Sequence, residues 1–284
     1  MWYVGRISGS KDRFTKTIIL DERNSDTSKF ENVAEFERES GKQAHIYLPD
    51  FLQGSHAPDR QVFMSAAVDM IKQSETDIEI LEIGAYAVSS MLTWSNAADK
   101  LLDRHCYITC IDPWVDFGAE LFTEQMAETL KSNLGYEVFC RNATLSPNNV
   151  HIYPVSGISR DILPKLHANK YDIIFIDGSH HYLDVLKDIT ESERLLRSGG
   201  IICGDDLELL LKQCDQEFAK MNTQSDYIKD PRSGKYSHHR VTLAVGEFFG
   251  DVFSFSGFWA MRLTSSGYQN ISFSEAKEPS LPGH

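Results

Sequence analysis

The sequence predicts an α/β protein with a doubly wound, largely parallel sheet. The clearest evidence is a strand–helix–strand unit in residues 171–206. There, the buried run YDIIFI is followed by Leu183–Arg197, with apolar residues at helical spacing, and then by Gly199-Gly200 and a second apolar run, IIC. A crossover of this length is right-handed, so its two strands are parallel and close in space. The runs IEILEI and CYITCID predict two more strands of the same sheet.

Three carboxylates follow the strands of this unit. Asp177 ends the first strand, and Asp205 and Asp206 end the second. Because the carboxyl ends of parallel strands lie at one edge of the sheet, where open α/β sheets bind ligands, we expect these side chains to lie together. Three neighbouring carboxylates repel one another unless a cation or proton joins them. The pattern predicts a hard divalent ion with oxygen ligands. The structural alternative is that Asp177 and Asp206 cap the helices that follow them.

A second candidate site lies earlier in the chain. In IEILEIGAYAVSS a strand breaks at Gly84 and a helix follows, so the free N–H groups of the helix would face a bound anion or polar group. The next strand ends in Asp112, which is placed to hydrogen-bond both hydroxyls of a ribose, and Trp114 would lie beside the ligand. A plain strand–helix turn remains the alternative, because Tyr86 and Val88 stand where small residues are expected. Asp112 would then be a cap and Trp114 a core residue.

The remaining elements follow from local patterns. The sequence predicts strands at KTIIL and AHIYL, a helix from Pro58, a helix over Glu120–Leu134 and a strand at VHIYPVS. Ser156-Gly157 ends that strand, and the glycine would let the backbone approach a base ring. After Asp206 we expect helices at LELLLKQCDQEFAK and VTLAVGEFF, then a hairpin with a Ser-Gly turn in DVFSFSGFWAMRL.

We divide the chain into three parts. Residues 1–57 carry no catalytic motif and are predicted to be a cap or a contact between copies of the chain, with a substrate lid as the alternative. Residues 58–264 form the main α/β domain. Residues 265–284, rich in Ser, Pro and Gly, are expected to be a loose tail.

Composition narrows the class of partner. The chain has 284 residues, of which 42% are hydrophobic and 24% charged, and no apolar run approaches the about 20 residues that span a bilayer. Its five cysteines show no CxxC spacing and its N-terminus lacks the layout of a signal peptide, which favours a cytoplasmic protein with reduced thiols. The net charge of −13 argues against nucleic acid as a partner and leaves a small molecule or a protein.

The motifs resemble those of a known family. Glu82-Ile83-Gly84 after the first strand, Asp112 after the second and Gly199-Gly200 before the fifth, in a chain of seven predicted strands with the last two paired, resemble class I S-adenosylmethionine-dependent methyltransferases, which have a Rossmann-like sheet. IDGSHHYLDVLKDI with LLRSGGIICGDD is similar to their metal-dependent branch, which holds the macrocin, mycinamicin and novobiocin O-methyltransferases and cephalosporin-hydroxylase-like proteins. VTLAVGEFFGD and FWAMRL are also similar. GAYAVSS departs from the commonest glycine-rich form.

The resemblance implies a reaction and its residues. It implies that Mg²⁺ or a similar ion binds Asp177, Asp205 and Asp206, and that His180 is the general base for an acceptor hydroxyl, because an alcohol is a poor nucleophile until it loses its proton. The implied substrate is a sugar-like or phenolic secondary metabolite with neighbouring oxygens. S-adenosylmethionine would be held at Glu82, Gly84, Ala85, Tyr86, Ser89, Asp112, Pro113, Trp114, Ser156, Gly157 and Asp177.

Two other functions remain open at this point. One is a nucleotide-dependent oxidoreductase or a hydroxylase, although the chain shows no GxGxxG and no recognisable two-histidine, one-carboxylate iron pattern. The other is a methyltransferase-like scaffold that binds a partner through residues 1–57 without catalysis. His238 and His239 lie in a long polar loop, where one of them would contact the acceptor or both would be solvated.

Overall fold

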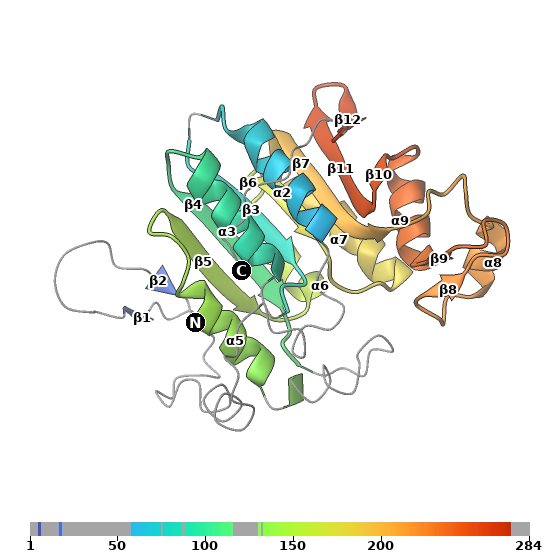
Figure 1. Ribbon diagram of the computed structural model, residues 1–284, viewed down its shortest axis with the longest axis horizontal. Coiled ribbons are helices and arrows are strands. Elements are labelled where there is room, and N and C mark those ends of the chain that lie inside the picture. Colours follow the sequence, from blue (N-terminus) through green and yellow to red (C-terminus); the bar gives the residue numbers. More distant parts are fainter. Residues whose placement is uncertain are drawn as a thin grey trace.

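A computed structural model describes residues 5–6, 17–18, 58–74, 76–86, 89–115, 130–131 and 133–273 (Figure 1). Within the N-terminal segment, β1 (Gly5–Arg6) pairs antiparallel with β2 (Thr17–Ile18), which falls in the predicted KTIIL strand. The predicted AHIYL strand lies outside the described residues, and so does most of the predicted helix at 120–134. The proposed roles of residues 1–57 therefore stay predictions.

The main sheet has the predicted doubly wound, Rossmann-like arrangement. Its strands run in the order β10-β11-β7-β6-β3-β4-β5, with β12 added beside β11. Strands β5, β4, β3, β6 and β7 are parallel, and β11 runs antiparallel to β7. Their bounds are β3 Ile78–Ile83, β4 Cys106–Asp112, β5 Val150–Ser156, β6 Tyr171–Ile176, β7 Leu196–Leu207, β10 Ser254–Phe255, β11 Gly257–Thr264 and β12 Gly267–Asn270.

Helices cover both faces of the sheet, as β-branched strands buried on two sides require (Figure 1). One core joins the sheet to α2 (Pro58–Ile71), α3 (Ser89–Leu101) and α5 (Leu134–Ala143). The opposite core joins it to α7 (Tyr182–Leu195) and α9 (His239–Phe249). The shorter elements are α6 (Ser159–Ile162), η2 (Leu163–Lys165), α8 (Gln216–Met221), β8 (Ile228–Lys229) and β9 (Tyr236–Ser237). No helix in the described part of the chain is long and apolar enough to cross a membrane.

Two boundary predictions were wrong. The helix predicted over 207–220 forms only in its last part, because β7 continues to Leu207, which pairs with Gly257 of β11, and α8 begins at Gln216. The tail predicted to be loose from residue 265 contains β12, which pairs with β11. In both places pairing to β11 overrides the local pattern. The predicted Ser-Gly hairpin, in contrast, is present as β10 and β11.

Gly84 allows the backbone that follows β3 to pass close to the backbone that follows β6. Its φ is +90°, and a Cβ at this position would lie 2.1 Å from the carbonyl oxygen of Asp177. We expect Gly84→Ala to lower the free energy of unfolding by more than about 3 kcal/mol, since both the backbone conformation and the contact oppose a side chain. Gly199→Ala is the matched control: φ is +81° but no atom lies within 4 Å, so the loss should be about 1 kcal/mol. Urea unfolding curves of the two variants test this; equal losses would contradict it.

Candidate functional site

The two predicted half-sites meet at the centre of the sheet. Gly84 follows β3 and Asp177 follows β6, and these strands are neighbours. The backbone N–H of Asp177 donates to the carbonyl of Ile83 at 2.9 Å, and that of Gly84 donates to Ile111 at 2.8 Å. Chain order reverses on either side of β3, so this is the position where doubly wound sheets bind ligands.

Asp112 braces the turn after β3. Its Oδ2 accepts a hydrogen bond from the backbone N–H of Tyr86 at 2.9 Å, and its Oδ1 accepts one from the N–H of Trp114 at 2.6 Å. Burial raises the pKa of this carboxyl to about 6, although the two backbone donors oppose the shift. The carboxylate therefore fixes the shape of the predicted cofactor turn, with Tyr86 at a positive φ of 38°. Its contact with a ribose stays a prediction.

Trp114 does not lie open beside a ligand site. Its side chain is buried, its ring centroid lies 4.9 Å from those of Tyr136 and Phe139, and its Nε1–H donates to the carbonyl of Tyr86 at 2.7 Å. Trp114 therefore packs in the core, as the structural alternative predicted, and its contact with a cofactor stays a prediction. The indole stabilises the predicted cofactor turn through its hydrogen bond to the carbonyl of Tyr86.

Glu82 is also an interior residue. Its side chain is fully buried, and its carboxylate accepts hydrogen bonds from the Ser90 hydroxyl and, at 3.7 Å, from the Cys110 thiol. Burial raises the pKa of Glu82 to about 8. The structure thus shows Glu82 anchoring α3 to β3, and it shows no surface of Glu82 for the predicted cofactor contact.

The other predicted cofactor residues line the same edge. Ala85 is buried in the turn, and the side chain of Ser89 at the start of α3 lies outside the described residues. Ser156 pairs with Asp112 across β4 and β5, and the N–H of Gly157 donates to the carbonyl of Asp112 at 3.0 Å. The ends of β4 and β5 therefore lie side by side at this edge. Pro113 follows β4 at this edge and is half-buried.

A guanidinium joins two of the three predicted metal ligands. Arg60, in the first turn of α2, places one nitrogen, Nη1, 2.8 Å from Asp177 Oδ2 and 2.7 Å from Asp205 Oδ2. Its side chain is 9% exposed. No sequence pattern indicates this contact, because Arg60 lies more than a hundred positions from its partners and only the sheet order brings α2 over the ends of β6 and β7.

The predicted magnesium site does not assemble around these side chains. Asp177, Asp205 and Asp206 do not form a group with ligand atoms within 4.8 Å of one another, whereas Asp177, His180 and Asp206 do. Asp205 and Asp177 share Arg60 instead. Since a cationic nitrogen already lies between these two carboxylates, the residues as arranged do not fit a hard divalent ion on the predicted trio. Asp206 is not a helix cap either, because it lies within β7, at φ 64°.

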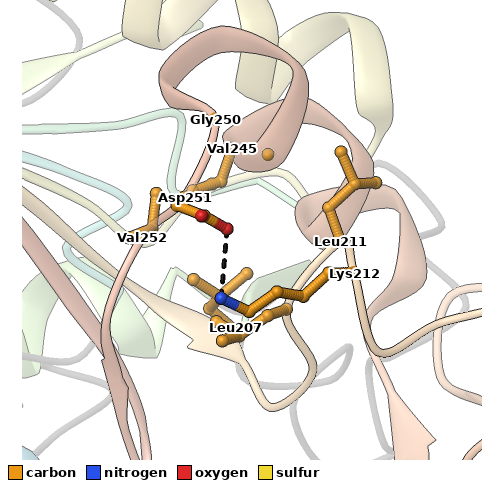
Figure 2. A pocket seen from close by; sticks show the side chains of 9 residues that line it. Leu207, Leu211, Lys212, Val245, Gly250, Asp251 and Val252 are labelled. Carbon is orange, nitrogen blue, oxygen red and sulfur yellow. Dashed lines mark hydrogen bonds and ion pairs between the residues drawn. The ribbon is translucent and has the colours of Figure 1, made fainter.

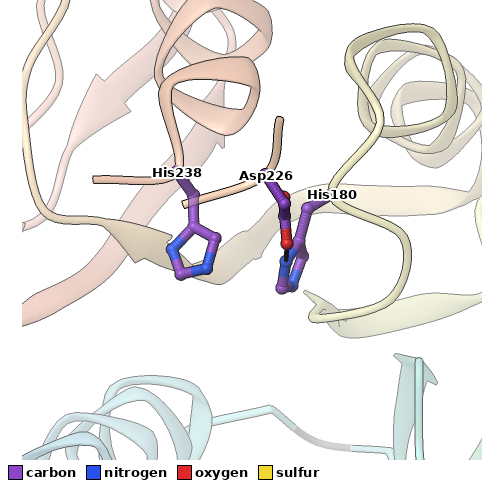
Figure 3. A group of neighbouring side chains, drawn as sticks. All are labelled: His180, Asp226 and His238. Carbon is purple, nitrogen blue, oxygen red and sulfur yellow. Dashed lines mark hydrogen bonds and ion pairs between the residues drawn. The ribbon is translucent and has the colours of Figure 1, made fainter. Parts of the chain in front are cut away.

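His180 lies between two carboxylates. Its Nε2 is 2.9 Å from Asp206 Oδ2. On the other side of the ring, its Nδ1 is 3.0 Å from Asp226 Oδ2 (Figure 3). Burial by itself would lower the pKa of His180, but Asp206 and Asp226 together raise it well above its usual range. Arg240 Nη2 donates to the other oxygen of Asp226 at 2.8 Å, and both side chains of this pair are only 4% exposed. Asp226 and Arg240 were missed by sequence reasoning.

His238 joins the same cluster, whereas His239 does not. The His238 Nδ1 lies 2.8 Å from Glu208 Oε1 and 3.5 Å from Asp206 Oδ1, and its ring meets that of His180 edge-on at a centroid distance of 4.6 Å (Figure 3). His239 is buried with its Nε2 2.8 Å from the carbonyl of Asn222. Of these two histidines, His238 therefore lies in the cluster around His180, and contact of either with an acceptor stays a prediction.

A separate hollow lies beyond the end of β7, between the following turn and the end of α9 (Figure 2). Lys212 and Asp251 form an ion pair across it at 3.1 Å. None of the clustered acids or histidines lines it, so it is not part of the candidate site. Its lining is Leu207, Leu210, Leu211, Lys212, Val245, Gly246, Gly250, Asp251 and Val252.

Comparison with known proteins agrees with this arrangement. Residues 81–207, which run from β3 to the end of β7, match a family model described as a methyltransferase domain. No curated protein matches the chain.

Similar solved structures include three O-methyltransferases. One is an O-methyltransferase from Bacillus cereus in complex with SAH, at 17% identity over 86% of this chain and 89% of that chain, with a TM-score of 0.41. Another is O-methyltransferase TomG from Streptomyces achromogenes, involved in tomaymycin synthesis, at 18% identity over 85% and 92%, with a TM-score of 0.43. O-methyltransferase NovP aligns at 15% identity over 72% and 80%, with a TM-score of 0.45.

Proposed function

We propose that the chain is an S-adenosylmethionine-dependent methyltransferase that transfers the methyl group to a hydroxyl oxygen of a small acceptor, and the match of residues 81–207 to a methyltransferase-domain model supports this. The acceptor class that we propose is a sugar-like or phenolic secondary metabolite with neighbouring oxygens. The cluster beyond β6 and β7 supports an oxygen acceptor, since a hydroxyl, unlike a thiolate or a free amine, needs a positioned base.

The observation that carries the proposal is the Arg240–Asp226–His180 series. Arg240 holds one oxygen of Asp226, and the other oxygen lies 3.0 Å from His180 Nδ1. A carboxylate on one ring nitrogen orients an imidazole and stabilises the imidazolium that forms when the opposite nitrogen takes a proton. In this arrangement Nε2 of His180 faces Asp206, so an acceptor hydroxyl would replace Asp206 at that nitrogen.

The proposed step follows from these positions. The acceptor hydroxyl gives its proton to His180 Nε2, its oxygen forms the bond to the methyl carbon, and the methyl–sulfur bond breaks with its electron pair going to sulfur. The products are the methyl ether, S-adenosylhomocysteine and an imidazolium beside Asp226. Gly84 and Asp177 bring the cofactor turn against the acceptor side, and holding the two reactants in line supplies much of the rate.

No step of the proposed reaction uses the magnesium ion that was predicted from the sequence. It would need Arg60 to leave Asp177 and Asp205, with which it forms ion pairs at 2.8 and 2.7 Å. Arg60 and the His180–Asp226 pair supply a fixed cation and a base without it.

Calorimetry with S-adenosylmethionine and S-adenosylhomocysteine tests the first part of the proposal. We expect one site per chain with micromolar affinity, and product formation when a panel of catechols and glycosides is added. Failure of both ligands to bind the folded chain would rule the proposed activity out. An unrelated nucleotide such as ATP is the control and should not bind in that range.

One observation favours a second candidate, a metal-dependent hydroxylase. His180, Asp226 and His238 present ligand atoms within 4.8 Å of one another (Figure 3), and two histidines with one carboxylate are the ligand set of non-haem iron oxygenases. No local sequence pattern indicates this group, because its three members lie in separate segments of the chain. Iron analysis of protein purified without oxygen decides: stoichiometric iron would favour the hydroxylase, and methyl transfer by iron-free protein would exclude it.

A further inference from the structure

We propose that Arg60 takes the place of a metal ion at the ends of β6 and β7, so that Asp177 and Asp205 bind Arg60 instead of magnesium. The metal-binding part of this inference rests on geometry alone. Its consequence, that methyl transfer proceeds without a divalent ion, rests on the function proposed above.

The guanidinium occupies the position of a bridging cation. A single nitrogen, Nη1, contacts one oxygen of Asp177 and one oxygen of Asp205, at 2.8 and 2.7 Å. The three side chains are 9%, 17% and 12% exposed, so water screens this contact weakly. The carbon CZ of Arg60 also lies 5.8 Å from the centre of the Phe175 ring, a cation–π distance.

The neighbouring acids also have side-chain partners within the chain. Asp206 contacts His180 at 2.9 Å, and Asp226 contacts Arg240 at 2.8 Å. The mutual repulsion that would otherwise recruit a divalent ion is therefore already relieved by side chains. A magnesium ion entering between Asp177 and Asp205 would meet the permanent charge of Arg60, which no accessible pH removes.

Titration calorimetry with MgCl₂ on the full chain tests this inference directly. We expect the wild type to show no binding up to millimolar Mg²⁺. We expect Arg60→Met to gain one site with at least about tenfold higher affinity, because two buried carboxylates lose their cation and magnesium prefers carboxylate oxygens. Adding Asp205→Asn to Arg60→Met should abolish the gain, which places the new site. Magnesium is the probe because the nearby histidines suit softer ions.

Arg197→Met is the matched control. Arg197 Nη1 contacts Asp172 Oδ2 at 2.7 Å at the opposite end of β6, so its loss frees a carboxylate outside the site and should create no magnesium binding. Arg60→Lys keeps a charge and should also gain none. Stoichiometric magnesium binding to the wild type would overturn the proposal whether or not the variants fold. A folded Arg60→Met that binds no magnesium would overturn it too.

The outcome is separable from that of the proposed function. If no acceptor is ever methylated, the magnesium titrations still decide what Arg60 does. If methyl transfer is found, it should persist in EDTA, and its loss there with recovery on adding Mg²⁺ would refute the metal-free site while leaving the methyltransferase activity intact.

Discussion

His180→Ala should lower kcat by about 10² to 10⁴-fold while leaving the affinity for S-adenosylmethionine nearly unchanged. The imidazole lies between Asp206 and Asp226, whereas the turn after β3 is held by the hydrogen bond from Tyr86 to Asp112. Its loss removes the proposed base without touching the cofactor turn. Single-turnover methyl transfer and calorimetry on the same preparation measure the two effects. His167→Ala, an exposed histidine in the loop before β6, is the control.

The pH profile separates a base from a structural histidine. Burial lowers the pKa of His180, but Asp206 and Asp226 outweigh it and raise the pKa well above its usual range. A base must be neutral to accept a proton, so kcat/KM should rise with pH through that raised pKa. Asp226→Asn removes one carboxylate, lowers the pKa and should shift the rise toward lower pH. An unshifted profile, or an unchanged kcat in His180→Ala, would remove His180 from the role.

Much of the framework could be predicted from the sequence because it is encoded locally. Period and glycine position located the ends of β3, β4, β6 and β7, and the rule that parallel strands end at one edge brought Gly84, Asp112, Asp177 and Asp205 to the same side. The turn at Gly84 could be predicted because a strand that breaks at a glycine is followed by a helix.

What the sequence could not show are contacts between distant segments. Arg60 looked like one charge in the first turn of a helix, and only the packing of α2 over β6 and β7 sets it between Asp177 and Asp205. Asp226 and Arg240 come from a loop and from α9, with no shared motif. The direction of the Trp114 side chain could not be predicted for a related reason. Position after a strand predicts nearness to the edge, whereas the direction of the side chain depends on whether the adjoining core, here Tyr136 on α5, has room for it.

Asp112→Ala should weaken binding of S-adenosylhomocysteine by about tenfold to a hundredfold and also lower the stability of the ligand-free chain. Both carboxylate oxygens accept backbone hydrogen bonds, from Tyr86 at 2.9 Å and from Trp114 at 2.6 Å. A hydrogen bond to a charged group contributes about 1.5–3 kcal/mol, so the loss of two is a large share of the stability of a domain. Thermal unfolding with and without the ligand measures both quantities. Asp103→Ala, whose side chain is 91% exposed, should change neither.

Comparing the loss of ligand affinity with the loss of stability decides whether Asp112 contacts the cofactor or only braces the turn. Burial raises its pKa to about 6, so a carboxylate that accepts from ribose hydroxyls would lose affinity for the ligand as the pH falls through about 6, because the protonated acid accepts fewer hydrogen bonds. If the carboxylate only braces the turn, its mutation would lower the stability of the protein, yet the fraction that remains folded would bind the ligand with wild-type affinity and without that pH dependence.

Asp112→Asn sharpens the distinction, since it retains one acceptor oxygen for Tyr86 or Trp114 while removing the charge. If affinity falls in Asp112→Asn more than stability does, the acid contacts the cofactor; if only stability falls, the cofactor role is refuted and the brace remains.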